Sequence, residues 1–263
     1  MKIAFITGSH PRHAMMARAL AETGALAGLI VEQREEHMPL PPQGLSSDLE
    51  KLFIHHFQKR KDAETRFFSS SDLPRVKTLH VTKEDLNGEA VGSFLQSINP
   101  DILLSYGVHM LSEETLSVVH GEKWNIHGGL SPWYRGAITH FWPSYFLAPQ
   151  MTGMTVHDLT MELDQGDVVH QNAAPLVKGD GIHDLACRAV QGLATELPKL
   201  LQVYSEKKIL QKKHHRTSGR LWRSKDWHPS HLRLIYDFYN DRIVDAYLAG
   251  ELEQTDPDLW RQF

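Results

Sequence analysis

Short apolar runs alternate with longer segments of helical character over the first half of the chain, and this alternation restricts the fold more than any other feature. The first run, 2–7, is followed by a loop, a helix-forming segment at 14–23 and a second run at 27–31. Strands separated by helices build parallel sheets that are covered on both faces. Further strands are predicted at 76–81, 101–106 and 124–127, with helices at 49–68, 87–97 and 112–119.

The second half of the chain continues this pattern up to about residue 205. Strands are predicted at 152–158 and 167–175, a helix at 137–147, and a long amphipathic helix at 182–204 that would cover one face of the sheet. The prediction for 1–205 is therefore an α/β domain with a doubly wound, mostly parallel, Rossmann-like sheet.

The remaining residues, 206–263, change in character and are predicted to be a separate, short helical C-terminal appendage. They begin with a basic stretch at 207–223, and 231–252 has helical periodicity. Aromatic side chains here could stack on a base or a sugar, or pack a terminal helix or a dimer contact. These side chains are Trp222, Trp227, Tyr236 and Tyr239.

Charge and cysteine content exclude several classes of protein. Lys and Arg total 28 against 32 Asp and Glu, a net charge of −4. Nucleic acid is therefore not the expected partner, although 207–223 is locally basic. Cys187 is the only cysteine, so no internal disulfide can form. No apolar run is long enough to cross a membrane, and we expect a cytoplasmic protein with no membrane partner.

The loop 8–13 (GSHPRH) joins the first strand to the first helix. It lacks the Gly-x-Gly-x-x-Gly pattern of dinucleotide sites, so no nicotinamide or flavin cofactor is predicted. A helix N-terminus can bind an anion, and Gly8, His10, Arg12 and His13 are candidate substrate contacts there. The alternative is a helix cap with exposed basic residues.

Two polar side chains interrupt the predicted strand 124–127. Asn125 and His127 are two positions apart, so they share one face of a strand, about 6–7 Å apart. The carboxyl end of a parallel strand is where open α/β sheets place their sites. Downstream, the loop 162–167 carries Glu162, Asp164 and Asp167. A carboxylate beside a histidine can set its tautomer and pKa or hold a water molecule, although acidic loops are often simply solvated.

These elements together resemble the formyltransferase catalytic domain. The resemblance rests on the Asn125-Ile126-His127 strand, the loop Leu130–Gly136 (LSPWYRG), and Leu163-Asp164 followed by Gly166-Asp167. It covers roughly residues 1–205 and is strongest over 101–170. The family includes methionyl-tRNA, glycinamide ribonucleotide and sugar N-formyltransferases.

The resemblance implies transfer of a formyl group from N10-formyltetrahydrofolate to an amine. It implies that Asn125, His127 and Asp164 are catalytic. Attack of an amine on a formamide carbon builds an oxyanion, to which Asn125 and a protonated His127 could donate. Asp164 would orient His127 or hold a proton-carrying water. Whether His127 acts mainly as a base or as an oxyanion donor stays open.

The family also implies where the folate binds. The pterin would lie between the segment after the fourth strand and the acidic loop. The predicted cofactor contacts are His109, Met110, Leu111, Met161 and Glu162.

The acceptor is predicted to be a nucleotide-linked amino sugar. The tRNA enzymes carry a larger C-terminal domain than 206–263 allows. Formyl-folate hydrolases add an N-terminal regulatory domain, whereas this sequence starts directly with the strand 2–7. The loop 8–13 resembles the corresponding segment of formyltransferases that act on nucleotide-linked 4-amino-4,6-dideoxy sugars in surface-glycan biosynthesis. Pseudaminic-acid-type precursors are among these sugars. The appendage implies a homodimer as one assembly state. A methionyl-tRNA transferase and another formyl-folate transferase or hydrolase remain alternatives.

A reading from a different class is a histidine-rich, metal-dependent hydrolase. The chain has 17 histidines, and His127, His140 and His157 with Asp158 could supply ligands. No spaced His or Cys metal motif supports that set, so no metal is predicted. A binding module without activity is a further alternative, but all three catalytic positions are present.

Overall fold

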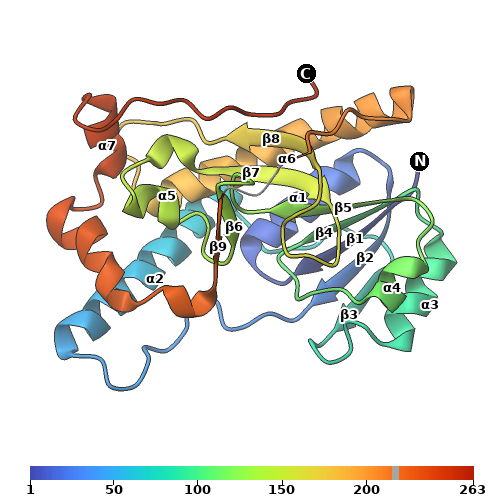
Figure 1. The fold of residues 1–263 in the computed structure, drawn as a ribbon. Helices are drawn as coiled ribbons and strands as arrows, with labels where there is room; N and C mark the ends of the chain where they lie inside the picture. The colour runs from blue at the N-terminus through green and yellow to red at the C-terminus, as the bar shows by residue number, and fades with distance from the viewer. Residues whose placement is uncertain (215–218) are drawn as a thin grey trace.

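The computed structural model describes residues 1–214 and 219–263, and its centre is a seven-stranded sheet (Figure 1). The strands are β1 (Ile3–Gly8), β2 (Leu26–Glu32), β3 (Thr78–Val81), β4 (Ile102–Tyr106), β5 (Glu122–His127), β7 (Gly153–Asp158) and β8 (Val168–Ala173). Their order is β3-β2-β1-β4-β5-β7-β8. The first five are parallel, and β7 and β8 continue the sheet antiparallel. The predicted mostly parallel, doubly wound sheet is confirmed.

Helices cover both faces of this sheet. One face packs against α1 (Pro11–Glu22), α2 (Ser47–Phe68) and α6 (Ile182–Lys207), and the other against α3 (Glu89–Ile98) and α4 (Glu113–Ser117). Strand β1 shows why both faces need cover. Ile3 and Phe5 belong to the first core, and Ala4 and Ile6 to the second, because side chains alternate along a strand.

The predicted helix at 137–147 is wrong for most of its length. Only α5 (Trp142–Tyr145) is helical, because the preceding residues pair with the tail instead. Strand β6 (Tyr134–Gly136) runs parallel to β9 (Arg220–Trp222), and Ala137 N–H donates to the Trp222 carbonyl oxygen. Ile138 has a φ of 59°, which a helix does not accommodate.

The predicted helix at 231–252 is broken into short turns. These are the 3₁₀ turn η3 (Pro229–His231), the π-helical turn η4 (Leu234–Phe238) and α7 (Ile243–Leu248). The break falls at Asn240 and Asp241, whose φ angles are 47° and 59°. A C-terminal helix is therefore present, but it is only six residues long.

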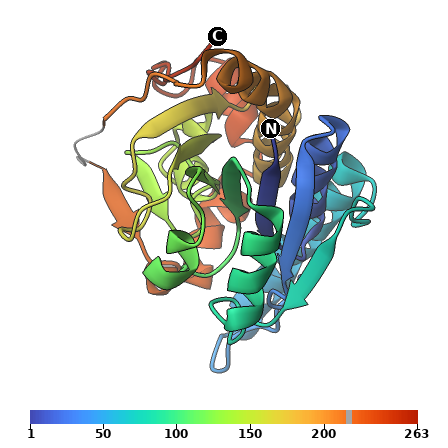
Figure 2. The same ribbon diagram turned by 90° about the vertical axis from the view of Figure 1, so that its right-hand side faces the viewer.

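The tail packs against the sheet domain at two places. Trp222, Leu232 and Ile243 share a hydrophobic cluster with Trp142 and Ile182 of the preceding chain. The last residues run back beside β8, where Gln171 N–H donates to the Trp260 carbonyl oxygen (Figure 1). The C-terminus lies near α6 (Figure 2), and the Lys199 ammonium is 4.1 Å from the Phe263 ring centre. The division into 1–205 and 206–263 stays a prediction.

No helix within 1–214 and 219–263 combines the length and apolar composition needed to cross a bilayer.

Candidate active site

A cavity of about 610 Å³ lies at the carboxyl ends of β1, β4 and β5. This is the end at which open α/β sheets bind ligands. Its volume is in the range of small-molecule sites. Its lining includes the segment 107–111 and the acidic loop, and also α2, the start of α6 and Trp227. Asn125 and His127 line the same cavity.

His127, at the end of β5, has one ring nitrogen fixed by the backbone. Its Nε2 lies 2.8 Å from the Tyr134 carbonyl oxygen, which can only accept, so Nε2 carries a proton and donates. Its Nδ1 lies 3.4 Å from Asp164 Oδ2. The histidine is 6% exposed. The Nδ1 atom is therefore the one that can exchange a proton, and it faces the carboxylate.

Asp164 is held ionised in a nearly buried position. The Gly136 N–H donates to Oδ2 at 2.8 Å, and His157 Nε2 is 3.3 Å from Oδ1. Burial by itself would raise the pKa of Asp164, but the charge of His127, the nearby His157 ring and the Gly136 N–H outweigh it and lower this pKa. The residue has a φ of 51°, a conformation that non-glycine residues rarely adopt. Positive-φ backbone of this kind clusters at functional sites.

Two neighbours orient Asn125. Ser105, on β4, donates to Asn125 Oδ1 at 2.8 Å, which leaves the Nδ2 group to donate. One Nδ2 hydrogen points to His157 Nε2 at 3.2 Å. Among the described residues nothing accepts the second hydrogen. Asn125 therefore retains a free donor in the cavity.

His157 is a member of this cluster that the sequence analysis considered only as a metal ligand. It lies opposite Asn125 because β7 pairs antiparallel with β5. Its Nδ1 donates to the Asp158 carbonyl oxygen at 2.8 Å, so Nε2 faces Asn125 and Asp164. The signal that could have found it is a histidine in a strand that neighbours the Asn-x-His strand.

The side chains of the loop 8–13 are largely paired with one another and with α2. Arg12 Nη1 is 2.7 Å from Glu64 Oε1, and its Nη2 bonds to His10 Nδ1 at 2.8 Å. Burial and then the charge of Arg12 lower the pKa of His10 to about 4, and the same two causes bring the pKa of His13 well below its usual range. Both imidazoles are therefore neutral at pH 7, and Gly8 lies beside the His13 ring. The contact of these residues with an acceptor stays a prediction.

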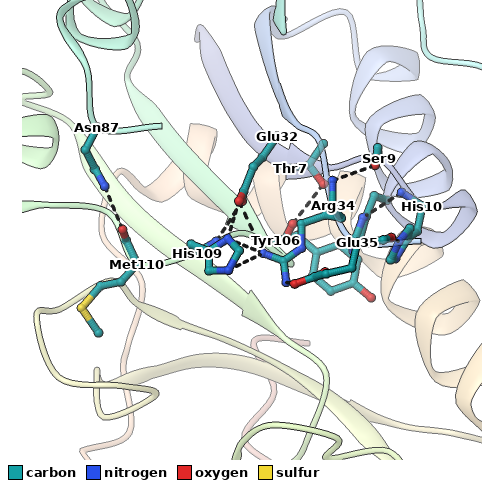
Figure 3. Close-up of polar contacts among 11 residues, drawn as sticks. Thr7, Ser9, His10, Glu32, Arg34, Glu35, Asn87, Tyr106, His109 and Met110 are labelled. Atoms are coloured by element: carbon teal, nitrogen blue, oxygen red, sulfur yellow. Dashed lines mark hydrogen bonds and ion pairs between the residues drawn. The ribbon is translucent and has the colours of Figure 1, made fainter. Parts of the chain in front are cut away.

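The segment 107–111 is anchored from two sides, as Figure 3 shows. Glu32, which is fully buried at the end of β2, accepts the His109 N–H at 2.9 Å and also bonds the His109 ring. Asn87 donates to the Met110 carbonyl oxygen at 3.0 Å. Gly107 has a φ of 65°, and a side chain there would overlap the His13 ring. The segment is thus a fixed wall of the cavity.

The predicted cofactor contacts are divided between this segment and the acidic loop. His109, Met110, Leu111 and Glu162 line the cavity, whereas Met161 lies in the same loop without lining it. Met110 is 57% exposed and Leu163 is 46% exposed. Exposed apolar side chains at the mouth of a cavity are typical of a ligand-binding surface.

The histidines proposed as metal ligands are not arranged as a ligand set. His140 bonds to the Gly153 carbonyl oxygen at 3.1 Å, and His157 Nδ1 bonds to the backbone. Across the part of the chain that the structure describes, no three His, Cys, Asp or Glu side chains are grouped to hold a metal ion.

Comparison with known proteins gives a family match and a set of similar folds. The family model described as formyl transferase matches residues 15–199, which is more than half of the chain. A phosphoribosylglycinamide formyltransferase from Anaplasma phagocytophilum is 17% identical, with a TM-score of 0.57 over 85% of this chain and 98% of that chain. A sugar N-formyltransferase from a Shewanella species is 16% identical, with a TM-score of 0.52 over 86% of this chain and 78% of that chain.

A third structure is the N-formyltransferase from Helicobacter canadensis in complex with folinic acid and dTDP-3-aminofucose. It is 14% identical, with a TM-score of 0.52 over 87% of this chain and 73% of that chain. At these identities the solved structures establish a shared fold, and the family model establishes membership. The chain belongs to the formyl transferase family and is an enzyme that transfers a formyl group.

Proposed function

We propose that this enzyme transfers the formyl group of N10-formyltetrahydrofolate to the amine of a nucleotide-linked amino sugar. The observation that carries the proposal is the grouping of Asn125, His127 and Asp164 at one wall of a 610 Å³ cavity. The finer assignment is a 4-amino-4,6-dideoxy sugar, of which pseudaminic-acid-type precursors are one kind, formylated in the cytoplasm for surface-glycan biosynthesis.

His127 and Asp164 form the proton-handling unit of this proposal. Because Nε2 of His127 donates to the Tyr134 carbonyl oxygen, Nδ1 is the nitrogen that gains or loses a proton. Asp164, 3.4 Å away, stabilises the charged imidazolium. The lowered pKa of Asp164 keeps the carboxylate charged throughout the neutral range.

Asn125 supplies electrostatic stabilisation. Its oriented Nδ2 group donates to the oxygen that gains negative charge during formyl transfer. Removing one such donor typically lowers the rate by ~10²–10³.

The residues of the cavity fit a folate. The folate supplies the formyl carbon when it is bound. The wall at 107–111 offers backbone groups in a fixed segment, and Met110 and Leu163 offer apolar contact to a flat ring. No hydrogen bond joins the backbone of Val108 or Leu111 to any other described residue. We assign His109, Met110, Leu111 and Glu162 to this half of the cavity, with Met161 behind them.

The sugar acceptor is supported by the second half of the cavity. Helix α2 and Trp227 of the tail also line the cavity, with aromatic rings and imidazoles that could contact a nucleotide sugar. Among the fold neighbours, the Helicobacter canadensis enzyme was crystallised with a dTDP-amino sugar. A homodimer is the proposed assembly.

The test is a thermal-shift screen of nucleotide-linked amino sugars in the presence of a folate that cannot transfer its formyl group. A ligand that binds only the native state raises the unfolding temperature. We expect stabilisation by one or more amino-sugar nucleotides and less by the same nucleotides carrying a hydroxyl sugar. Turnover with the real formyl donor, measured as release of tetrahydrofolate, follows for each hit.

Stabilisation by glycinamide ribonucleotide or by methionyl-tRNA, without any response to amino-sugar nucleotides, would overturn the acceptor class. No response to any folate would overturn the proposal as a whole.

A further inference from the structure

Three arginines line the cavity, and Arg60 is the one that forms no ion pair with any described residue. Arg12 is 2.7 Å from Glu64. Arg34 lies 3.0 Å from Glu35 and 3.5 Å from Glu32. The permanent charge of Arg60 is therefore the one in this cavity that a ligand can neutralise without breaking an existing pair.

The guanidinium of Arg60 is held in place but only partly satisfied. It lies over the Phe57 ring, 4.5 Å from its centre, and Nη2 donates to the His37 carbonyl oxygen. Its Nε is buried and has no partner, and nothing among the described residues accepts from Nη1. Nη1 and one hydrogen of Nη2 remain, and a guanidinium with donors free on both of these nitrogens suits two oxygens of one anion.

Glu64 is the carboxylate whose charge acts on Arg60, and it is already paired with Arg12. Burial is the main cause that lowers the pKa of His37 and of Arg60 itself, to about 4 and about 10. It also lowers the pKa of His56 to about 3 and that of His183 well below its usual range. At pH 7 the imidazoles are thus neutral and Arg60 is charged. A partly buried cation with no described carboxylate at ion-pair distance is unfavourable, and a bound anion would offset that cost.

A wall of rings leads from Arg60 toward the catalytic cluster. Phe57 lies against Trp227 with ring centres 6.4 Å apart, and His56 lies 6.1 Å from Phe141. Phe141 follows His140, which also lines the cavity. Such rings suit a nucleoside or the apolar face of a sugar, and they lie between the cation and the reacting groups.

We propose that Arg60 binds a phosphate group of the amine acceptor, so that phosphate recognition belongs to α2 and is not confined to the loop 8–13. This rests on the proposed function in one respect, namely that the acceptor binds in this cavity. The ligand class is a phosphate ester or diphosphate joined to an amine-bearing sugar.

The experiment measures binding of inorganic pyrophosphate to the full chain by calorimetry at constant ionic strength. We expect Arg60→Gln to weaken binding by about tenfold or more, since a hydrogen bond to a charged group contributes on that scale. Arg60→Lys should weaken it less, because the charge remains without the fork. Lys51→Gln, an exposed charge removal on the same helix, should leave it unchanged.

Thermal unfolding of each variant keeps the result interpretable. Arg60→Lys keeps the charge and the long side chain. If Arg60→Gln loses pyrophosphate binding and a folded Arg60→Lys largely keeps it, the loss reports on the contact between the cation and its anion. Equal pyrophosphate affinity in the wild type and a folded Arg60→Gln variant overturns the proposal.

The acceptor assay separates this proposal from the proposed function. With an amino-sugar nucleotide that turns over, Arg60→Gln should raise the KM for the acceptor about tenfold and leave the KM for the formyl donor unchanged. If no amino-sugar nucleotide turns over while pyrophosphate binding still depends on Arg60, the acceptor assignment fails and the phosphate site stands.

Discussion

At the scale of single residues, the candidate site is defined by which atoms are already engaged by the protein. The Nε2 of His127 and the Oδ1 of Asn125 both have protein partners. What is left is one Nδ2 hydrogen of Asn125 and Nδ1 of His127, which lies 3.4 Å from the Asp164 carboxylate. These groups match the two requirements of formyl transfer to an amine, a donor for the developing oxyanion and a means of removing a proton.

Replacing Asp164 by asparagine should lower kcat by at least about 10²-fold, because the neutral amide cannot stabilise the charged His127 ring. His127→Ala and Asp164→Ala should each abolish turnover. The measurement is steady-state kinetics with the folate and the amine acceptor, together with thermal unfolding to show that the fold persists. Asp167→Asn, in the same loop but half-exposed, is the matched control. Retained activity in a folded Asp164 variant would contradict the assignment.

Replacing Glu32 by glutamine should weaken folate binding about tenfold. The buried carboxylate accepts the His109 N–H and bonds the ring of the same residue, so it positions the wall at 107–111. Binding of a non-transferable folate, measured by fluorescence or calorimetry, tests this. Glu35→Gln removes a neighbouring, exposed carboxylate and should have little effect. A similar loss in both variants would point to general electrostatics instead of positioning.

At the scale of elements, the pairing of β6 with β9 connects the tail to the cluster around Asp164. Gly136 ends β6 with a φ of 92°, and its N–H donates to Asp164. A side chain at this position would overlap the Trp222 carbonyl oxygen. The tail therefore contributes to holding the residue that donates to Asp164, and not only to covering the sheet domain.

Gly136→Ala should lower both the free energy of unfolding and kcat. Backbone strain of this kind costs about 1–3 kcal/mol, and the overlap adds to it. Gly24→Ala is a matched control, because Gly24 has a φ of 70° but open space around it. Denaturant unfolding should show a larger loss for Gly136→Ala than for Gly24→Ala, with activity lost only in the former. Equal losses would mean that the contact with Trp222 contributes nothing.

At the scale of the whole molecule, several imidazoles in or near the cavity are kept neutral by folding. Burial is the largest cause of each lowered pKa, and the values are about 4 for three of these histidines and about 3 for a fourth. The four residues are His10, His37, His140 and His56. Because the unfolded chain has its histidine pKa near 6.5, it binds protons before the folded chain does.

The free energy of unfolding should therefore be fully expressed above about pH 6.5 and fall as the pH drops toward 4. Each histidine contributes a slope of at most about 1.4 kcal/mol per pH unit. Denaturant midpoints between pH 7.5 and 4.5 measure the slope. His140→Gln should reduce this slope by up to about 1.4 kcal/mol per pH unit, the contribution of one proton. Replacing the exposed His80 by Gln should leave the slope unchanged. An unchanged slope in His140→Gln would mean that this ring is not held neutral.

Much of the fold could be predicted because its determinants are local. The apolar runs that become β1, β2 and β4 are buried on both faces, and their alternation with helices leaves few topologies. The start of α4 is also determined locally, because the Ser112 side chain at its N-cap accepts the Thr115 N–H. The predictions that failed, 137–147 and 231–252, lie where distant segments compete. Ala137, the first residue of the predicted helix 137–147, donates to the Trp222 carbonyl oxygen beside the pairing of 134–136 with 220–222.

By itself, the sequence determined the parallel sheet, the position of Asn125 and His127 on one strand face, and the resemblance that points to formyl transfer. Only the tertiary structure decided which atoms of that cluster are free, that His157 joins it, and that Arg12 is paired while Arg60 is not. Strand periodicity and the order of motifs are properties of the sequence itself, so they can be recognised without the structure. The pairing of a charge depends on segments such as 10–12 and 60–64, which become neighbours only when the helices pack against the sheet.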